Sequence, residues 1–307
     1  MNVRHKITKL TPKLSTSVFI LLSIFTHIII LGSTTSAPSY AYSPCNCVIF
    51  AMDDLNDSTY SKVQLATMDY FISRNLPFTA SIIVSLLANS SNLDVYHKIQ
   101  EGMDRKLFEI AIHGYRHINH ALMSYEQQKD DLSTANARLE HLFGKRSDIF
   151  IPPGNAFNLH TIEAMADLNI SILSTGYHQE QNTTNPYKLK TLVETNNSRL
   201  EVSKVNDEKP LVYHVPFIVS FLRLKNQGLS GDGLVEESLR FINESIAKYG
   251  FAQVRLHPSD FSQVNSTTGK PINELDAIKF QQLTQLVDSL EARNIRIISF
   301  SDILYPH

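Results

Sequence analysis

The sequence predicts an α/β protein, a distorted (β/α) barrel of seven or eight strands that is TIM-barrel-like. The first reason is that short apolar runs rich in β-branched residues alternate with longer stretches of helical period. The second is that no linker and no internal repeat divides the 307 residues. The third is that titratable side chains follow several of the short runs, as expected where the strands of a barrel end at one rim.

The eight short runs are the expected strands. They cover residues 47–52, 78–84, 108–112, 149–151, 170–173, 211–215, 252–256 and 295–299. Helices are expected at 59–75, 93–103, 125–143, 159–168, 234–249 and 275–293. Ser124 with Gln127 makes a capping box for the third helix, and Asn158 can cap the fourth. Because this strand and helix repeat builds a parallel sheet, seven or eight repeats can close into a barrel.

The first 41 residues are predicted to be a signal peptide. A basic segment without acidic residues comes first and contains Arg4, Lys6, Lys9 and Lys13. An apolar run at 18–31 and small residues before a cleavage point at Ala41 complete the pattern. The alternative is an uncleaved N-terminal anchor. Residues 42–307 are then expected to form one catalytic domain that is secreted or held at the cell surface.

The charge of the mature chain limits its partners. Removal of residues 1–41 leaves 24 of the 28 Lys and Arg residues against 30 Asp and Glu residues. This mildly acidic balance argues against nucleic acid or an anionic membrane surface as the main partner. Membrane contact is expected only through an uncleaved N-terminal anchor, and no specific protein partner is predicted.

The sequence also leads to expectations for one irregular segment and for the two cysteines. Residues 177–207 are polar and irregular, and they are expected to be either a substrate-facing insertion or a surface loop. The only two cysteines are Cys45 and Cys47. Because Cys-x-Cys is a poor disulfide pair and no other thiol could complete a zinc-thiolate site, they are predicted to be two thiols near the start of the mature chain.

Two neighbouring carboxylates end the first apolar run. Of Asp53 and Asp54, one can bind a cation while the other accepts a proton from a bound water. His113 and His117, four residues apart after the third run, can complete a site with three ligands and open positions. The alternative for the aspartates is a helix N-cap pair. His120 could replace one of the named ligands.

Other strand ends carry further candidates. Pro152, Pro153, Gly154 and Asn155 follow the fourth run, His214 lies near the end of a later run, and His257 ends the seventh. In a barrel, these residues meet at the same rim as the two aspartates. The alternatives are a solvated loop histidine for His257 and a packed or surface histidine for His214.

Taken in this order, the motifs resemble those of the polysaccharide deacetylase family, also called carbohydrate esterase family 4 or the NodB-homology domain. The resemblance covers roughly residues 48–300. It implies that Asp53 is the general base, that Asp54, His113 and His117 bind a divalent metal, usually zinc, and that His257 is the general acid. The implied reaction is removal of N-acetyl groups from a glycan by metal-activated water, which yields acetate and an amino sugar.

The substrate is expected to contact the Pro-rich turn. A backbone N–H near Pro153 to Asn155 is expected to stabilise the oxyanion. The predicted substrate-binding residues are Pro153, Gly154, Asn155, Asn158 and His214. The remaining hypotheses are a metal-dependent hydrolase of another amide or of an O-acetyl ester, and a non-catalytic glycan-binding protein on the same fold.

The chain also departs from the family pattern. Many members have an arginine that begins the Pro-rich motif and orients the base, where this chain has Ile151. Asn155, Asn158 and Arg116 are candidates to replace it, with a turn, a helix cap and a solvated cation as their alternatives. The chain has no tryptophan, so the aromatic wall beside the acetyl group would come from Tyr177, Tyr213 or Phe217. Asp260 is the candidate carboxylate partner of His257.

Overall fold

The computed structural model describes residues 45–176 and 212–304. The predicted signal peptide at 1–41 and the predicted insertion at 177–207 lie outside the described residues. None of the helices within the two described ranges is long and apolar enough to cross a membrane.

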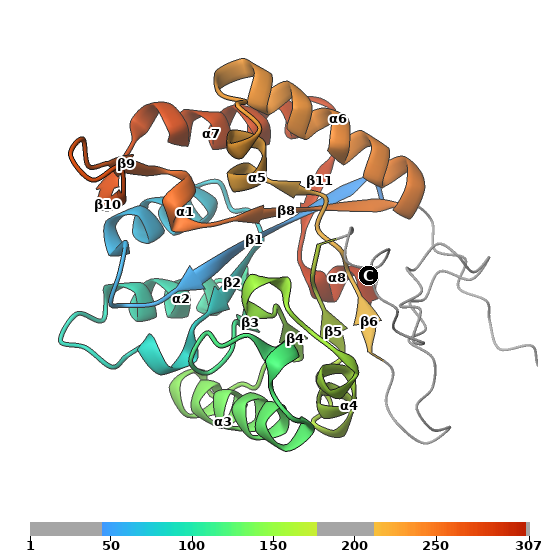
Figure 1. Ribbon diagram of the computed structural model, residues 1–307. Helices are drawn as coiled ribbons and strands as arrows, with labels where there is room; N and C mark the ends of the chain where they lie inside the picture. The colour runs from blue at the N-terminus through green and yellow to red at the C-terminus, as the bar shows by residue number, and fades with distance from the viewer. Residues whose placement is uncertain (1–44, 177–211, 305–307) are drawn as a thin grey trace, which may run out of the picture. The chain divides into compact units, whose positions relative to one another are not determined.

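A parallel sheet forms the centre of the described fold, with helices around it (Figure 1). Its strands are β1 (Cys47–Leu55), β2 (Phe78–Ile82), β3 (Phe108–Ile112), β4 (Ile149–Phe150), β5 (Ile172–Leu173), β6 (Tyr213–His214), β7 (Val219–Ser220), β8 (Phe251–Leu256) and β11 (Arg296–Ile298). They pair in the order β6-β5-β4-β3-β2-β1-β8-β7, and β11 pairs with the first residues of β1. The predicted strands are therefore present in one sheet.

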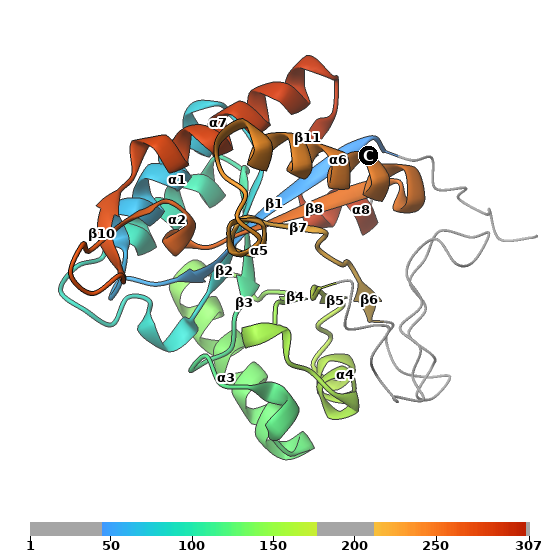
Figure 2. The same ribbon diagram turned by 45° about the horizontal axis from the view of Figure 1, so that its top comes forward.

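The two ends of this sheet are joined by one short segment of chain. β6 pairs with β5 and β7 pairs with β8, although residues 215–218 are all that separates β6 from β7. Between them, Phe217 forms a parallel bridge with Gly176. Figure 2 shows β6 and β7 following one another across this junction. Residues 213–220 thus curl the sheet into a distorted barrel, which confirms the predicted fold class.

The six predicted helices are confirmed. They are α1 (Ser61–Ser73), α2 (Asp94–Asp104), α3 (Tyr125–Phe143), α4 (Leu159–Asp167), α6 (Gly231–Tyr249) and α7 (Ala277–Ala292). The predicted capping box of Ser124 is present at α3, and the predicted cap Asn158 forms a second capping box, with Thr161, at α4. Short elements that the periodicity did not predict are β7, α5 (Phe221–Asn226), α8 (Phe300–Leu304) and the hairpin of β9 (Ser262–Val264) with β10 (Pro271–Leu275). Single 3-10 turns lie at Val84–Leu86, His120–Leu122, Pro153–Asn155 and Pro258–Asp260.

β1 is buried on both faces, because its side chains alternate between two apolar clusters. Val48, Phe50 and Met52 belong to the larger cluster, which includes residues of the surrounding helices. Cys47 and the other odd-numbered residues through Ala51 belong to the smaller cluster. That cluster is formed mainly by strand residues, such as those of β4 and β5, and it fills the inside of the barrel. Asp53 continues the inward-facing series.

The expectation of two thiols at the start of the mature chain is wrong in this structure. Cys45 and Cys47 are joined in a disulfide. Cys47 is fully buried as the first residue of β1, and the N–H of Cys45 donates to the carbonyl oxygen of Gly250 at 3.0 Å. The pair is therefore held against the barrel by strand pairing and by a backbone hydrogen bond.

Candidate active site

The two aspartates directly precede Leu55, the last residue of β1. Asp53 is buried, whereas Asp54 is partly exposed and has a left-handed backbone with φ of 64°. This conformation is uncommon outside glycine, although Asp and Asn adopt it more readily than other residues. Because the strand irregularity begins here, the two neighbouring carboxylates point to different places. Helix α1 begins only at Ser61, so the alternative of a helix N-cap pair is wrong.

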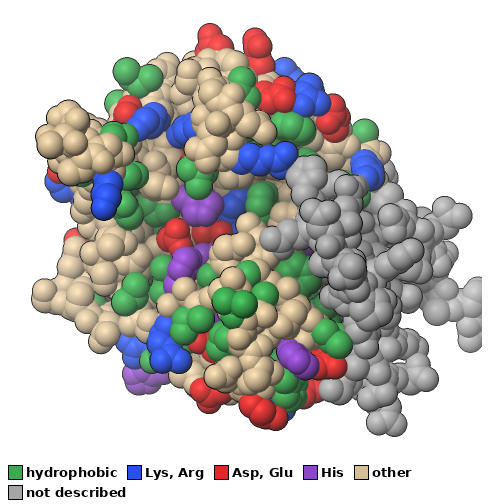
Figure 3. Space-filling model, viewed as in Figure 1, with side chains coloured by type: hydrophobic (Ala, Val, Ile, Leu, Met, Phe, Trp, Pro, Cys, Tyr) green, Lys and Arg blue, Asp and Glu red, His purple; other side chains and the backbone are tan. Residues whose placement is uncertain are grey.

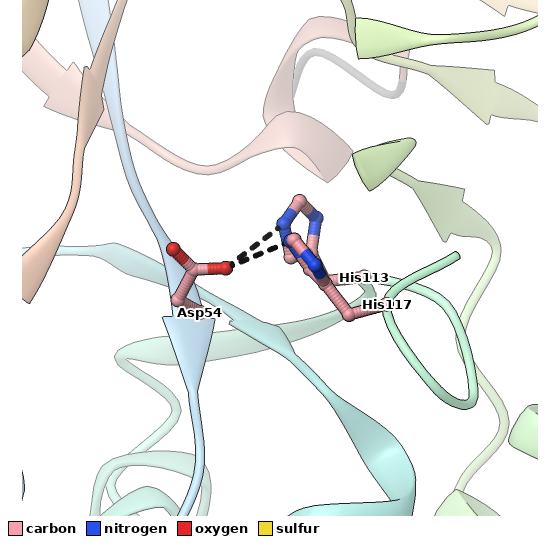
Figure 4. Close-up of side chains that lie close together, drawn as sticks. All are labelled: Asp54, His113 and His117. Atoms are coloured by element: carbon pink, nitrogen blue, oxygen red, sulfur yellow. Dashed lines mark ion pairs between the residues drawn. The ribbon is translucent and has the colours of Figure 1, made fainter. Parts of the chain in front are cut away.

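Asp54 lies beside two histidines from the loop that follows β3. Its Oδ1 atom is 3.3 Å from Nε2 of His113 and 3.1 Å from Nε2 of His117. Figure 4 shows this oxygen facing both imidazole rings. One ligand atom from each of the three side chains lies within 4.8 Å of the others. The structure thus brings together the three residues that the sequence analysis named as metal ligands.

The buried member of this trio is oriented by a backbone contact. Nδ1 of His113 lies 2.7 Å from the carbonyl oxygen of Ile151. Since a carbonyl oxygen only accepts, Nδ1 carries a proton and donates to it, which leaves Nε2 facing Asp54. A ligand histidine that donates through its second nitrogen is the usual arrangement at metal centres.

The pKa shifts in this trio show that its carboxylate favours a positive charge beside it. Burial raises the pKa of Asp54, but the contacts with His113 and His117 outweigh it and hold that pKa far below its usual range. Burial lowers the pKa of His113, but the charges of Asp53 and Asp54 outweigh it and raise that pKa. Without a cation, a proton on an imidazole supplies the positive charge that the carboxylates attract.

A divalent metal fits this donor set. Asp54 Oδ1 is buried and makes no regular hydrogen bond among the described residues, although Nε2 of both His113 and His117 lies beside it. Two imidazole nitrogens and one carboxylate oxygen, with other positions open, are the ligands of catalytic zinc sites. His120 is not part of the group, because it is fully buried and its Nε2 lies 3.2 Å from Oδ2 of Asp131. The alternative that His120 replaces a named ligand is therefore wrong.

The partner of Asp53 is Arg255 of β8, which the sequence analysis missed. Its Nη1 donates to Oδ2 of Asp53 at 2.8 Å, and its Nη2 donates to Oγ of Ser174 at 2.7 Å. The guanidinium lies over the ring of Phe217 at 4.6 Å, and Arg255 is only 1% exposed. This buried ion pair is made inside the barrel, so the residue that contacts Asp53 is Arg255 and none of the three candidates Asn155, Asn158 and Arg116.

One sequence signal could have found Arg255. It is the single charged residue in the apolar run expected at 252–256, and a charge in a buried strand needs an opposite charge nearby. The alternation of β8 places it on the same side as Gln253, and Gln253 also contacts Ser174. Asp53 keeps a second oxygen, Oδ1, without a hydrogen-bond partner among the described residues.

His257 lies between two carboxylates at the end of β8. Its Nε2 is 3.9 Å from Oδ2 of Asp53, and its Nδ1 is 3.9 Å from Oδ2 of Asp260. The backbone N–H of His257 donates to the same Asp260 oxygen at 2.7 Å. Burial raises the pKa of Asp260, and the charges of His257 and Lys225 oppose that rise only in part. Asp260 is thus placed as the carboxylate partner of His257.

The Pro-rich turn packs beside the loop that carries His113 and His117. A Cβ atom built on Gly114 would lie 3.3 Å from Cγ of Pro153, so the turn packs closely on that loop. Asn155 has φ of 57°, and its backbone N–H donates to Pro152 within the turn. Pro153 has no N–H, which leaves the exposed Gly154 as the candidate backbone donor for an oxyanion.

The other two predicted substrate contacts have structural partners. The side chain of Asn158 caps α4 by accepting from the N–H of Thr161, and its Nδ2 donates to the carbonyl oxygen of Ala121. His214 is fully buried, and its Nε2 lies 2.7 Å from Oγ1 of Thr175. These environments match the alternatives of a helix cap and a packed histidine, so a role of either residue in substrate binding stays a prediction.

The site opens on one face of the molecule. In the view of Figure 1, histidine and acidic side chains lie together near the middle of this face, over the end of β1 (Figure 3). His117 has 43% of its side chain exposed and Asp54 has 37%, whereas the side chain of Asp53 is 5% exposed. His117 and Asp54 are thus reachable from solvent, whereas Asp53 is buried.

Comparisons with known proteins agree with this geometry. Residues 42–173 match the family model of polysaccharide deacetylase. No curated protein matches the chain. Similar solved structures include a carbohydrate esterase family 4 pseudoenzyme from Bacillus anthracis, with 12% identity and a TM-score of 0.53 over 84% of this chain. The chain spans only 65% of that pseudoenzyme.

Two further solved structures have the same fold. The chitin deacetylase of Colletotrichum lindemuthianum has 11% identity and a TM-score of 0.52, over 85% of this chain and 88% of its own. A peptidoglycan N-acetylglucosamine deacetylase has 12% identity and a TM-score of 0.51, over 84% of this chain and 87% of its own. At such identities the likeness concerns the fold.

Proposed function

Because this chain is a divergent member of the polysaccharide deacetylase family, we propose that it is a metal-dependent hydrolase that removes N-acetyl groups from a glycan. The observation that carries the proposal is the convergence of Asp54, His113 and His117 beside the buried Asp53 and Arg255 pair. A metal site alone occurs in many proteins. A metal site next to a carboxylate with one anchored and one unpartnered oxygen is an arrangement for activating water.

Asp53 is the proposed base. Arg255 holds its Oδ2 atom, so the carboxylate has a fixed orientation and its Oδ1 atom remains to accept a proton from the attacking water. The same guanidinium is also the ion-pair partner of Asp53 inside the barrel. A cation held by Asp54, His113 and His117, most simply Zn²⁺, would polarise the acetyl carbonyl and make the water more acidic.

His257 is the proposed acid. Its imidazolium form can give a proton from Nε2 to the leaving amine, because Nε2 faces Asp53 and the reaction site. Asp260 lies on the Nδ1 side and stabilises the positive charge on the ring before the transfer. The exposed N–H of Gly154 is the proposed donor to the oxyanion.

We also propose that the protein is exported through its N-terminal segment. A basic segment, an apolar run and small residues in this order support the proposal. The disulfide between Cys45 and Cys47 supports it as well, since disulfides persist in oxidising compartments. An N-acetylated glycan outside the cell is the proposed substrate.

Acetate release from a panel of acetylated glycans tests the proposed function. We expect the purified protein, supplied with zinc, to release acetate from N-acetylglucosamine oligomers. Release only from O-acetyl esters would support the esterase hypothesis instead. Glycan binding without acetate from any member of the panel would support a non-catalytic protein, as in the pseudoenzyme of the same fold.

Metal analysis tests the site without any substrate. We expect wild-type protein to hold one equivalent of zinc after dialysis, and we expect Asp54→Ala and His113→Ala to lose it, because each removes one of three donors. His97→Ala changes an exposed histidine of α2 and serves as the matched control. Zinc retained by both ligand variants would show that the ligand assignment is wrong.

A further inference from the structure

His120, the third histidine of the loop after β3, is buried and contacts residues other than Asp54, His113 and His117. His120 is fully buried, and its ring packs edge-on against Phe150 with centroids 4.8 Å apart. Its Nδ1 lies 2.9 Å from the carbonyl oxygen of Ile118 and so donates to it. Its Nε2 faces Oδ2 of Asp131, a residue of α3, at 3.2 Å. Burial of a histidine and a carboxylate costs free energy, because both groups lose their contacts with water. This cost points to a structural role of the pair in the loop.

Asp131 holds the loop at a second point as well. The same Oδ2 atom accepts a hydrogen bond from the backbone N–H of Tyr115 at 2.9 Å. Tyr115 and His120 lie two residues before and three residues after His117. One carboxylate of a long, capped helix therefore fastens both sides of the turn that carries this metal ligand.

His117 depends on this turn for its position. Its backbone is left-handed, with φ of 55°, and its side chain is exposed and contacts Asp54. Unlike His113, which lies at the end of β3 and donates to Ile151, it is not held by a strand. Gly114, at the start of the turn, also fits closely, since a Cβ there would lie 3.3 Å from the backbone nitrogen of His117.

We propose that Asp131 and His120 are positioning residues that set His117 for metal binding. Asp131 acts on the near side of the turn through Tyr115 and on the far side through the His120 ring. The inference rests on the proposed metal site. It assigns part of the zinc affinity to a pair that does not touch the metal, as outer partners of ligand residues do in other metal sites.

Zinc affinity of Asp131→Leu, measured by competition with a chromophoric chelator, tests this inference. Leucine keeps the shape of the side chain but offers no acceptor, so we expect zinc affinity to fall by about 10–100-fold. Asp131→Asn keeps an acceptor for the Tyr115 N–H and should retain most of the affinity. Asp130→Leu makes the same change at the exposed neighbouring residue and should bind zinc as the wild type does. Excess zinc should return acetate release by Asp131→Leu to near the wild-type rate, which a merely unstable protein would not show.

Wild-type zinc affinity in a folded Asp131→Leu variant would overturn the inference. If that variant does not fold, His120→Phe keeps a ring of similar size against Phe150 and removes both nitrogens, and unchanged affinity there would also overturn it. The result is distinct from that of the proposed function. A wild-type protein that binds zinc but releases no acetate contradicts the function alone, whereas equal zinc affinity in Asp131→Leu contradicts the positioning pair alone.

Discussion

Replacement of Arg255 by methionine is expected to lower the free energy of unfolding by about 3–5 kcal/mol, because it leaves the buried carboxylate of Asp53 without its ion-pair partner. Acetate release should fall as well, since Asp53 then loses its fixed orientation. Methionine keeps much of the aliphatic volume over Phe217 and removes the guanidinium. Urea unfolding of chelated protein measures the loss in free energy.

A double-mutant cycle separates this charge effect from a packing effect. Asp53→Asn removes the charge that Arg255→Met leaves unpaired, so the double variant should be more stable than Arg255→Met alone. Arg255→Lys, which keeps a positive charge but not the two-point contact with Asp53 and Ser174, should fall between methionine and the wild type. Equal stability of Arg255→Met and the wild type would mean that the pair does not hold Asp53.

Asp53→Asn is expected to reduce acetate release by about 10²–10⁴-fold, the usual contribution of a general base. Asparagine has almost the same shape, and it still offers an oxygen to Arg255, but it cannot accept a proton from water. Zinc content should stay at the wild-type level, because Asp53 is not among the three ligands. Initial rates on an N-acetylglucosamine oligomer, with zinc content measured on the same sample, check both expectations.

Asp57→Asn is a poor control for this experiment, since that carboxylate accepts from the backbone at the start of α2. Asp69→Asn is better, because Asp69 is exposed and forms an ion pair with Lys98 at the surface of α1 and α2. It should change neither rate nor zinc content. Full activity in Asp53→Asn would remove Asp53 from the mechanism.

The long elements of the fold could be predicted because burial imposes their period on the sequence. The six helices and the strands of the sheet lie where apolar residues repeat at helical or strand spacing. The hairpin of β9 and β10 could not be predicted, since most of its side chains are exposed or half-buried and its apolar residues form no buried face. The closure of the barrel could not be predicted either, because it depends on two separate strands of only two residues each, β6 and β7.

The residues of the site likewise include some that the sequence could predict and one that it could not. Asp53, Asp54, His113 and His257 could be named because parallel strands end at one rim, so residues at separate strand ends meet there. Arg255 was missed because its partner lies 202 positions away and on the inner side of the barrel. Pairings of this kind depend on which strands are neighbours, and only the sheet order places β8 beside β1.

His120 shows the limit of spacing as a guide to ligands. Its spacing from His117 would suit a helix face, but the chain after His113 is a loop that turns His120 into the core. There it contacts Asp131, and His117 remains at the surface beside Asp54. The cysteines show a related limit, because Cys47 is the first residue of β1 and the N–H of Cys45 is hydrogen-bonded to Gly250, contacts that the Cys-x-Cys spacing alone does not reveal.

The central claim is that Asp54, His113 and His117 hold a metal that Asp53 uses to hydrolyse an acetamide. The most direct test is acetate release from an N-acetylglucosamine oligomer by one preparation in three states: zinc-loaded, chelated, and reloaded with zinc. We expect release in the first state, loss in the second and recovery in the third. Acetate release that continues unchanged after complete removal of the metal, or none from protein shown to hold zinc, would contradict the claim.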